Sequence, residues 1–299
     1  MNLITVLSDT LGLWEKEYYQ SEGQMKPLKL SMQETVEAEV FLPDQIGHLL
    51  HKTDCKPVSQ EKSCTIRCRK IDTFSCACHK YMELANENGS VQNKDIAVLN
   101  FANPVHPGGG VRYGARAQEE DLCRRSSLLL SLESEAAESY YRFNQQCDRL
   151  LSSDALIISP KVEVVKDKYY KPLPESIIVS VITCAAPIFC LDFMAEEENA
   201  VLRQEQHYKL FYQRIQIMLL VSAYYGFRNL ILGAWGCGAF GNDAEIVAEL
   251  FQAALESKDT TGYSMKDYFQ SIDFAVPGLS NPYNHEQFYK KFGSLDENR

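Results

Sequence analysis

The sequence predicts a three-layer α/β domain, because two short apolar runs each lead into a glycine-rich loop and then into a helix. Residues 96–99 precede the first loop and residues 229–232 precede the second, and both runs have the composition of buried strands. A third run, residues 177–183, is apolar almost throughout, as expected of a central strand covered on both faces. Strands that alternate with helices and carry loops at their carboxyl ends are typical of this fold class.

The elements of the first half follow from periodicity and capping residues. We expect one or two helices between residues 8 and 40, a short helix at 45–52, an edge strand at 64–71, a helix at 74–84 that Asp72 and Thr73 cap, a strand at 96–101, and helices near 116–132 and 134–149. Residues 1–60 are thereby predicted to form an N-terminal helical extension, packed on a catalytic domain of residues 61–299.

The second half alternates in the same way. We expect strands at 155–160, 162–165 and 177–183, a long helix at 195–225, a strand at 229–232, a helix at 243–257, a strand at 271–277 and a helix at 285–292. The apolar stripe of the long helix, which includes Phe211, Ile215 and Met218, predicts core packing.

The composition excludes several classes of function. With 299 residues, 45% of them hydrophobic, and a net charge of −10, the chain predicts a globular protein without the basic face that DNA or RNA binding needs. A polyanionic substrate must then be held locally by backbone N–H groups. The longest apolar stretch, residues 215–225, is too short to span a bilayer, and residues 1–9 do not resemble a signal peptide. We therefore expect no membrane partner and an intracellular location, cytoplasmic or nuclear.

Ten cysteines raise the question of a metal site. Cys64, Cys68, Cys76, Cys78 and His79 lie within sixteen positions, but their spacings are CxxxC and CxCH and not two CxxC pairs. Reduced thiols are the favoured interpretation over structural zinc, and no metal or organic cofactor is expected.

The first glycine loop, residues 108–111, follows the strand that ends with residues 100–101. Three consecutive glycines let the backbone approach a ligand closely. Seven residues after them, Gln118, Glu119 and Glu120 stand at the start of an amphipathic segment. This layout suits a phosphate-bearing substrate with acid–base chemistry beside it. A surface turn followed by acids that complement a helix dipole is the alternative.

The second glycine loop, residues 236–241, weakens that alternative. It follows the strand at 229–232 and precedes a helix that begins near Asp243, so it too can aim N–H groups at a phosphate. Its spacing is neither that of a nucleotide-binding P-loop nor that of a dinucleotide-binding loop. Two such loops in one sheet predict a clamp on a diphosphate.

These motifs resemble those of a known protein family. The run Asn100-Phe101-Ala102-Asn103 with the first glycine loop resembles the ribose-contacting strand and loop of macrodomains. The continuation to Gln118-Glu119-Glu120 is similar to the signature of macrodomain-type poly(ADP-ribose) glycohydrolases, particularly the microbial-type branch, and GAWGCGAFGND resembles their diphosphate loop. The resemblance covers roughly residues 64–292. It implies a macrodomain-like mixed sheet and hydrolysis of the ribose–ribose bonds of poly(ADP-ribose), with release of ADP-ribose.

The resemblance also implies site residues. Glu120 would be the catalytic acid and base, placed by Glu119 and Gln118, and Asp72 would accept a hydrogen bond from the adenine amino group. The remaining substrate-binding residues would be Asn103 for the distal ribose, Gly108, Gly109, Gly110 and Val111 for one side of the phosphates, Gly236, Cys237, Gly238, Ala239, Phe240 and Gly241 for the other side, and Phe274 at the adenine end.

The chemistry agrees with a single catalytic glutamate. Glycosidases usually flank the scissile bond with two carboxyl groups, and the transition state resembles an oxocarbenium ion. Glu119 and Glu120 are adjacent, so on a helix their side chains diverge by about 100° and cannot flank one bond. One glutamate must then protonate the leaving oxygen and later deprotonate a water molecule.

Several alternatives stay open. The acidic charge and the bulky Arg112 and Tyr113 favour action at chain ends, or on a mono-ADP-ribosyl group attached to protein, over cleavage inside a polymer. A non-catalytic macrodomain that binds ADP-ribose would keep both glycine loops without needing Glu119 and Glu120. An unrelated nucleotide or phosphosugar enzyme would be indifferent to Asp72.

Overall fold

A seven-stranded mixed sheet forms the centre of the molecule in the computed structural model, which describes residues 1–50, 57–58, 63–189, 200–279 and 281–293. The strand order is β3 (Glu39–Phe41), β6 (Leu156–Lys166), β7 (Pro172–Cys184), β5 (Ile96–Phe101), β8 (Asn229–Leu232), β9 (Ser271–Ala275) and β4 (Thr65–Arg69). The five strands from β7 to β4 run parallel, while β6 is antiparallel to both of its neighbours.

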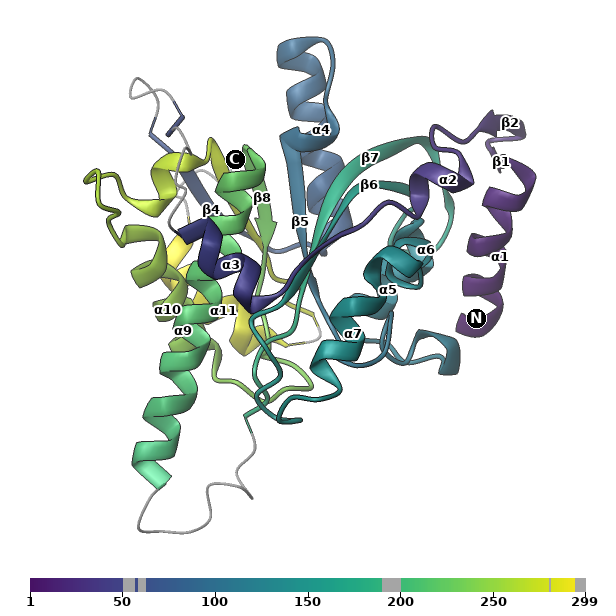
Figure 1. The fold of residues 1–299 in the computed structure, drawn as a ribbon. Helices are drawn as coiled ribbons and strands as arrows, with labels where there is room; N and C mark the ends of the chain where they lie inside the picture. Colours follow the sequence, from purple (N-terminus) through teal and green to yellow (C-terminus); the bar gives the residue numbers. More distant parts are fainter. Residues whose placement is uncertain (51–56, 59–62, 190–199, 280, 294–299) are drawn as a thin grey trace.

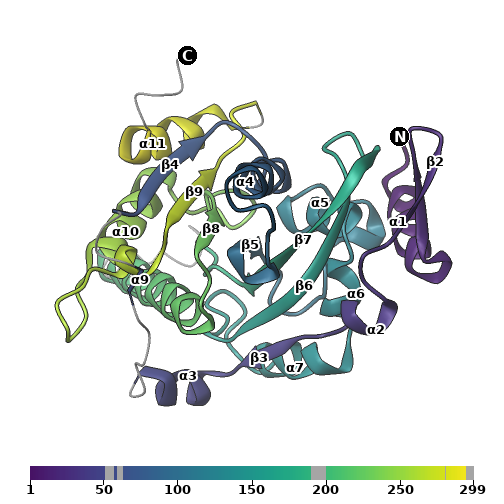
Figure 2. The ribbon, with the colours of Figure 1, turned by 90° about the horizontal axis from the view of Figure 1, so that it is seen from above.

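Helices cover both faces of this sheet (Figures 1 and 2). One layer contains α4 (Thr73–Asn88), α5 (Gln118–Arg125), α6 (Leu128–Leu132) and α7 (Glu138–Asn144), and the other contains α9 (Ala200–Tyr225), α10 (Ala244–Glu256) and α11 (Pro282–Phe292). The side chains of β5 alternate between the two cores, since Ile96 and Val98 face the first layer while Ala97 and Leu99 face the second. The predicted three-layer α/β fold is confirmed.

Most predicted elements are present with small shifts of their ends. The strands at 96–101 and 229–232 match β5 and β8, and β4 lies at the sheet edge as expected. Residues 155–160 and 162–165 form one strand, β6, with a bulge between Ser159 and Val162. The predicted helix at 45–52 corresponds to α3 (Pro43–Leu50), and its last two residues lie outside the described residues, as do Cys55, Cys190 and the predicted start of the long helix at 195.

The predicted helix at 116–132 is wrong at its centre. Ser126 has an extended backbone, with φ −151° and ψ 179°, and pairs as an isolated bridge with Val164 of β6. The N–H of Ser127 donates to the carbonyl of Glu163 over 3.1 Å. Because these pairings replace helical hydrogen bonds, α5 ends at Arg125 and α6 begins at Leu128. The helix predicted at 134–149 is likewise shorter, a 3₁₀ turn (Glu135–Ala137) followed by α7.

The N-terminal part contains more strand than predicted. After α1 (Leu3–Lys16) come a hairpin of β1 (Tyr18–Ser21) and β2 (Gln24–Pro27), a single helical turn α2 (Met32–Thr35), and β3. The hairpin turn places Glu22 and Gly23 at positive φ, of 51° and 77°. Sequence periodicity over such short segments does not distinguish them from helix.

The first helix packs against α5 and β6 through a buried polar contact. The hydroxyl of Thr10 donates to the carbonyl of Arg124 over 2.7 Å, and Nζ of Lys166 donates to that hydroxyl over 2.6 Å and to the carbonyl of Val6 over 3.2 Å. This contact fixes the end of α5, the helix that begins with Gln118 and the glutamate pair. Within the described part of the chain, no helix is long and apolar enough to cross a membrane.

Candidate active site

Both glycine loops lie at the carboxyl ends of neighbouring parallel strands, the first after β5 and the second after β8. This edge of the sheet borders a cavity of about 950 Å³. Segments far apart in sequence line it, and they include Asp72, Gln118, Gly236, Phe240 and Val276. A cavity at the carboxyl ends of parallel strands is the usual ligand position in α/β folds.

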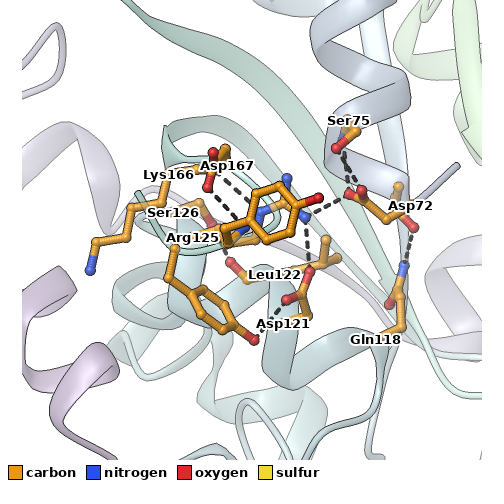
Figure 3. A network of polar contacts seen from close by, with 12 residues as sticks. Asp72, Ser75, Gln118, Asp121, Leu122, Arg125, Ser126, Lys166 and Asp167 are labelled. Atoms are coloured by element: carbon orange, nitrogen blue, oxygen red, sulfur yellow. Dashed lines mark hydrogen bonds and ion pairs between the residues drawn. The ribbon is translucent and has the colours of Figure 1, made fainter. Parts of the chain in front are cut away.

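Asp72 holds the start of α4 and meets a buried arginine. Its Oδ1 accepts the N–H of Ser75 over 2.9 Å and a bond from Nη1 of Arg125 over 2.6 Å, and its Oδ2 accepts from the Ser75 hydroxyl over 2.5 Å. Figure 3 shows this carboxylate facing Arg125. Burial works to raise the pKa of Asp72, but the Arg125 charge and the Ser75 hydrogen bonds outweigh it and hold the pKa below its usual range.

The first glycine loop lies directly on the glutamate pair. Gly109 has φ +58°, and a Cβ atom added there would come 2.5 Å from Oε1 of Glu120 and 3.1 Å from Oε2 of Glu119. The N–H of Gly110 donates to Oε1 of Glu120 over 2.8 Å. Both the backbone conformation and the close approach therefore require glycine at position 109.

Glu119 is enclosed by donors from strand β5 and the residues after it. Its Oε1 accepts from the side-chain amide of Asn100 over 3.1 Å, and its Oε2 accepts from the N–H of Asn103 over 2.7 Å. Only 2% of Glu119 is exposed. Burial raises its pKa to about 8, even though these hydrogen bonds favour the carboxylate.

Glu120 differs from Glu119 in having one oxygen without a partner. Its Oε1 accepts from Gly110, whereas its buried Oε2 has no hydrogen-bond partner among the described residues. Only 6% of the residue is exposed. Of the two adjacent glutamates, Glu120 is thus the one whose carboxyl group has an oxygen without a hydrogen-bond partner among the described residues.

Gln118 and Asn103 use their side chains to shape the protein around the site. The side chain of Gln118 accepts from the N–H of Phe101 over 2.9 Å and donates to the carbonyl of Leu99 over 2.8 Å, which attaches α5 to the end of β5. The Oδ1 atom of Asn103 accepts the N–H groups of Val105 and His106, both over 2.9 Å. Of these two, only Gln118 lines the cavity.

The second glycine loop is held by a residue that the sequence analysis missed. Asn242, buried beside Gly236, donates its Nδ2 to the carbonyls of Gly236 and Pro187 over 3.0 and 2.9 Å. Its Oδ1 then accepts from Nε2 of His207 over 2.7 Å. Asn242 stands directly between the last loop glycine and Asp243, which caps α10. This position in the sequence could have indicated that Asn242 supports the loop.

The structure divides the predicted site residues into two groups. Those that line the cavity are Asp72, Gln118, Gly236, Gly238, Ala239 and Phe240. Those that lie around it without being part of the lining formed by the described residues are Asn103, Gly108, Gly109, Gly110, Val111, Glu119, Glu120, Cys237, Gly241 and Phe274. The sequence analysis also missed Arg125, which lines the cavity, and gave no separate role to Asn100, which donates to Glu119.

Phe274 lies elsewhere than expected, which corrects its assignment to the adenine end. Its side chain is fully buried on β9 and stacks on Phe292 of α11, with ring centroids 4.2 Å apart. The following residues, Ala275, Val276 and Pro277, line the cavity instead. In a strand, successive side chains point to opposite faces, and the face of Phe274 belongs to the core beneath α10 and α11.

The donor set of the site does not resemble a metal centre. In the described ranges, no group of three or more histidine, cysteine, aspartate or glutamate residues is arranged to hold a metal ion. The two aspartates that line the cavity, Asp72 and Asp121, are instead paired with Arg125. The second glycine loop and the cations Lys70, Arg116 and Lys168 line the cavity, and the first glycine loop and the two buried glutamates lie around it.

Comparison with known proteins gives a consistent result. Residues 8–167 match the family described as "Microbial-type PARG, catalytic domain". The structure of poly(ADP-ribose) glycohydrolase (PARG) from Thermomonospora curvata has 30% sequence identity and a TM-score of 0.80, covering 97% of this chain and 99% of that one. The Deinococcus radiodurans PARG in complex with ADP-ribose has 31% sequence identity and a TM-score of 0.74, covering 90% of this chain and 100% of that one. A further structure is the Thermomonospora enzyme bound to the inhibitor ADP-HPD, with 30% identity, a TM-score of 0.77, and coverage of 97% and 99%. No curated protein sequence matches the chain.

Proposed function

The chain belongs to the microbial-type PARG catalytic-domain family, and from this premise we propose that it hydrolyses the O-glycosidic ribose–ribose bonds of poly(ADP-ribose). The products are ADP-ribose units released from chain ends, and Glu120 is the general acid and base. The substrate class agrees with the ligands of two related structures, one of which is in complex with ADP-ribose and the other bound to the inhibitor ADP-HPD.

The observation that carries the assignment of Glu120 is the difference between the two adjacent carboxyl groups. Each oxygen of Glu119 accepts a hydrogen bond from β5 or the residues after it. Glu120 uses only Oε1, and its Oε2 has no partner among the described residues. A group that exchanges a proton with substrate needs an oxygen that is not already bonded within the protein, whereas a group with both oxygens bonded there positions its surroundings.

The reaction then needs a single carboxyl group. Protonated Glu120 gives its proton to the ribose oxygen that leaves as its bond to the anomeric carbon breaks. The resulting carboxylate takes a proton from a water molecule, whose oxygen bonds to the anomeric carbon and completes hydrolysis. The N–H of Gly110 stabilises the Glu120 carboxylate at this stage, because its bond to Oε1 over 2.8 Å is strongest when that oxygen is charged.

The glycine loops and Asp72 hold the nucleotide part of the substrate in this proposal. Backbone N–H groups of residues 236–241 bind the diphosphate on one side and residues 108–111 lie on its other side, with Phe240 packing against the distal ribose. In the first loop, the N–H groups of Gly109, Gly110 and Val111 already donate within the protein. Asp72 accepts a hydrogen bond from the adenine amino group at the other end of the cavity, which both Asp72 and Phe240 line. Their positions on one continuous cavity of about 950 Å³ support an extended ligand of this kind.

The net charge of the protein supports the preference for chain ends. A net charge of −10 disfavours a long grip on a polyanion. The positions of Arg112 and Tyr113 do not support the expectation that their bulk favours chain ends, because Arg112 pairs with Glu133 over 2.6 Å and Tyr113 is 90% exposed. Neither residue is part of the cavity lining formed by the described residues.

The test is incubation of the wild type and Glu120→Gln with auto-modified poly(ADP-ribosyl) protein, with products resolved by chromatography. Release of free ADP-ribose by the wild type alone supports the proposal, and the absence of longer oligomers supports attack at chain ends. Release from mono-ADP-ribosylated protein only would replace it with a mono-ADP-ribosyl hydrolase. Binding of ADP-ribose without release from either substrate would leave a non-catalytic ADP-ribose-binding module.

A further inference from the structure

Arg125 is a buried cation shared by two carboxylates at the cavity. Its side chain is 1% exposed, and Nη1 lies 2.6 Å from Oδ1 of Asp72 and 2.9 Å from Oδ2 of Asp121. Its Nε donates to the carbonyl of Lys166 over 3.2 Å, and its guanidinium lies over the ring of Phe74, 5.6 Å from the centroid. These contacts come from α4, α5 and β6, so the guanidinium has little freedom to move (Figure 3).

The hydrogen bonds of Asp72 leave one acceptor position open. Each carboxylate oxygen accepts about two hydrogen bonds. Oδ1 is filled by the N–H of Ser75 and by Arg125, while Oδ2 accepts only the Ser75 hydroxyl. The Asp72 side chain is 22% exposed and lines the cavity, so a ligand there can meet this carboxylate, on which Oδ2 has the remaining position.

The second carboxylate makes the charge of Arg125 necessary. Asp121 binds the same Nη1 atom, and its other oxygen accepts from the Tyr170 hydroxyl over 3.0 Å. Without Arg125, two carboxylates would share a partly buried site with no cation between them, and like charges favour the uptake of a proton by one of them. A protonated Asp72 would become a hydrogen-bond donor as well as an acceptor.

We propose that Arg125 is a positioning residue that determines base specificity, by holding Asp72 as a charged group that only accepts hydrogen bonds and has one position open. Such a group binds a purine with an amino group at position 6 and rejects a purine with an oxygen there, since two acceptors would then face each other. This inference rests on the proposed function, in which the adenine of ADP-ribose lies against Asp72.

The experiment compares the affinities of two ligands by calorimetry: ADP-ribose and its hypoxanthine analogue, inosine diphosphate ribose. The wild type should bind ADP-ribose about 10-fold to 100-fold more tightly, which is the effect of one hydrogen bond to a charged group. Arg125→Gln should reduce this ratio towards one. The ratio of the two affinities is the informative quantity, because a general destabilisation of the fold weakens the binding of both ligands alike.

Two further variants separate positioning from structural damage. Arg214 is a matched control, since it is also 1% exposed and paired with a carboxylate, Asp154, but lies outside the cavity lining of the described residues. Arg214→Gln should lower the melting temperature and keep the wild-type ratio. If Arg125→Gln does not fold, as judged by circular dichroism, Arg125→Met takes its place, because it removes the cation, leaves both carboxylates and keeps an unbranched side chain beside the Phe74 ring. It should show the same reduced ratio.

The outcomes distinguish this inference from the proposed function. A folded Arg125 variant that keeps the wild-type ratio overturns the role of Arg125. In that case Asp72→Asn, which can donate to an oxygen at position 6, shows whether Asp72 alone selects the base. A wild type that binds neither ligand overturns the proposed function, and the role of Arg125 falls with it.

Discussion

The backbone N–H of Gly110 lies 2.8 Å from Oε1 of Glu120, so the first glycine loop binds the carboxyl group of the helix that follows it. The loop therefore uses this N–H within the protein. It also orients one oxygen of Glu120 and leaves the other without a partner among the described residues.

Glu120→Gln should lower kcat by about 100-fold or more, because an amide can neither give nor take the proton that the reaction requires. Its affinity for ADP-ribose should stay within a few-fold of wild type, since glutamine keeps the shape of the side chain. Steady-state rates and calorimetry measure these quantities. Glu138→Gln, at an exposed position on α7, is the control and should leave both unchanged. Wild-type kcat in Glu120→Gln would remove Glu120 from the mechanism.

Gly109→Ala should reduce activity by more than its loss of stability explains. The added Cβ would lie 2.5 Å from Oε1 of Glu120, and the backbone at φ +58° disfavours alanine by about 1–2 kcal/mol. Gly114→Ala is a matched control, because Gly114 has φ +81° but its Cβ would meet only Ile4, at 3.8 Å. Both variants should melt at lower temperature, and only Gly109→Ala should lose kcat. Equal rates in the two variants would contradict the close approach.

The stability of the protein should depend on pH through Glu119. Burial raises its pKa in the folded state to about 8, whereas the unfolded value is near 4.5. Between these values the folded state binds a proton that the unfolded state does not, so stability is full below about pH 4.5 and falls as the pH rises to about 8. Glu119→Gln removes this titration, and its free energy of unfolding should change less than that of wild type from pH 5 to pH 8. Urea unfolding at several pH values measures the difference, and parallel curves would contradict it.

Asn242→Ala should weaken ADP-ribose binding by about 1–3 kcal/mol, because the second glycine loop loses the side chain that holds the Gly236 and Pro187 carbonyls. Asn144→Ala is the matched control, since Asn144 is also a buried amide and binds Ser153 outside the cavity lining of the described residues. Both variants should have lower melting temperatures. Calorimetry should find weaker binding only for Asn242→Ala, and unchanged affinity there would show that the loop keeps its shape without this residue.

The parts of the molecule that the sequence predicted correctly are those that local chemistry determines. The apolar runs at 96–101 and 229–232 became β5 and β8 with the expected bounds. Asp72 caps α4 as expected, because a short acidic side chain can bind the free N–H groups of the helix beginning beside it. Apart from Gly238, the glycines of both loops lie where the backbone passes close to other groups, and glycine allows that at little steric cost.

Tertiary structure decided the features that depend on partners far apart in the chain. Arg125 meets Asp72 across 53 positions and His207 meets Asn242 across 35, and no local periodicity contains either pair. Ser126 interrupts a helical pattern because it pairs with β6. Phe274 packs against α11 because its side chain lies on the face of the sheet that this helix covers. Composition and spacing specify which residues can form strands, loops and caps, since those preferences arise within a few residues. Which side chains converge on the cavity depends on the packing of distant segments, and only the folded chain determines it.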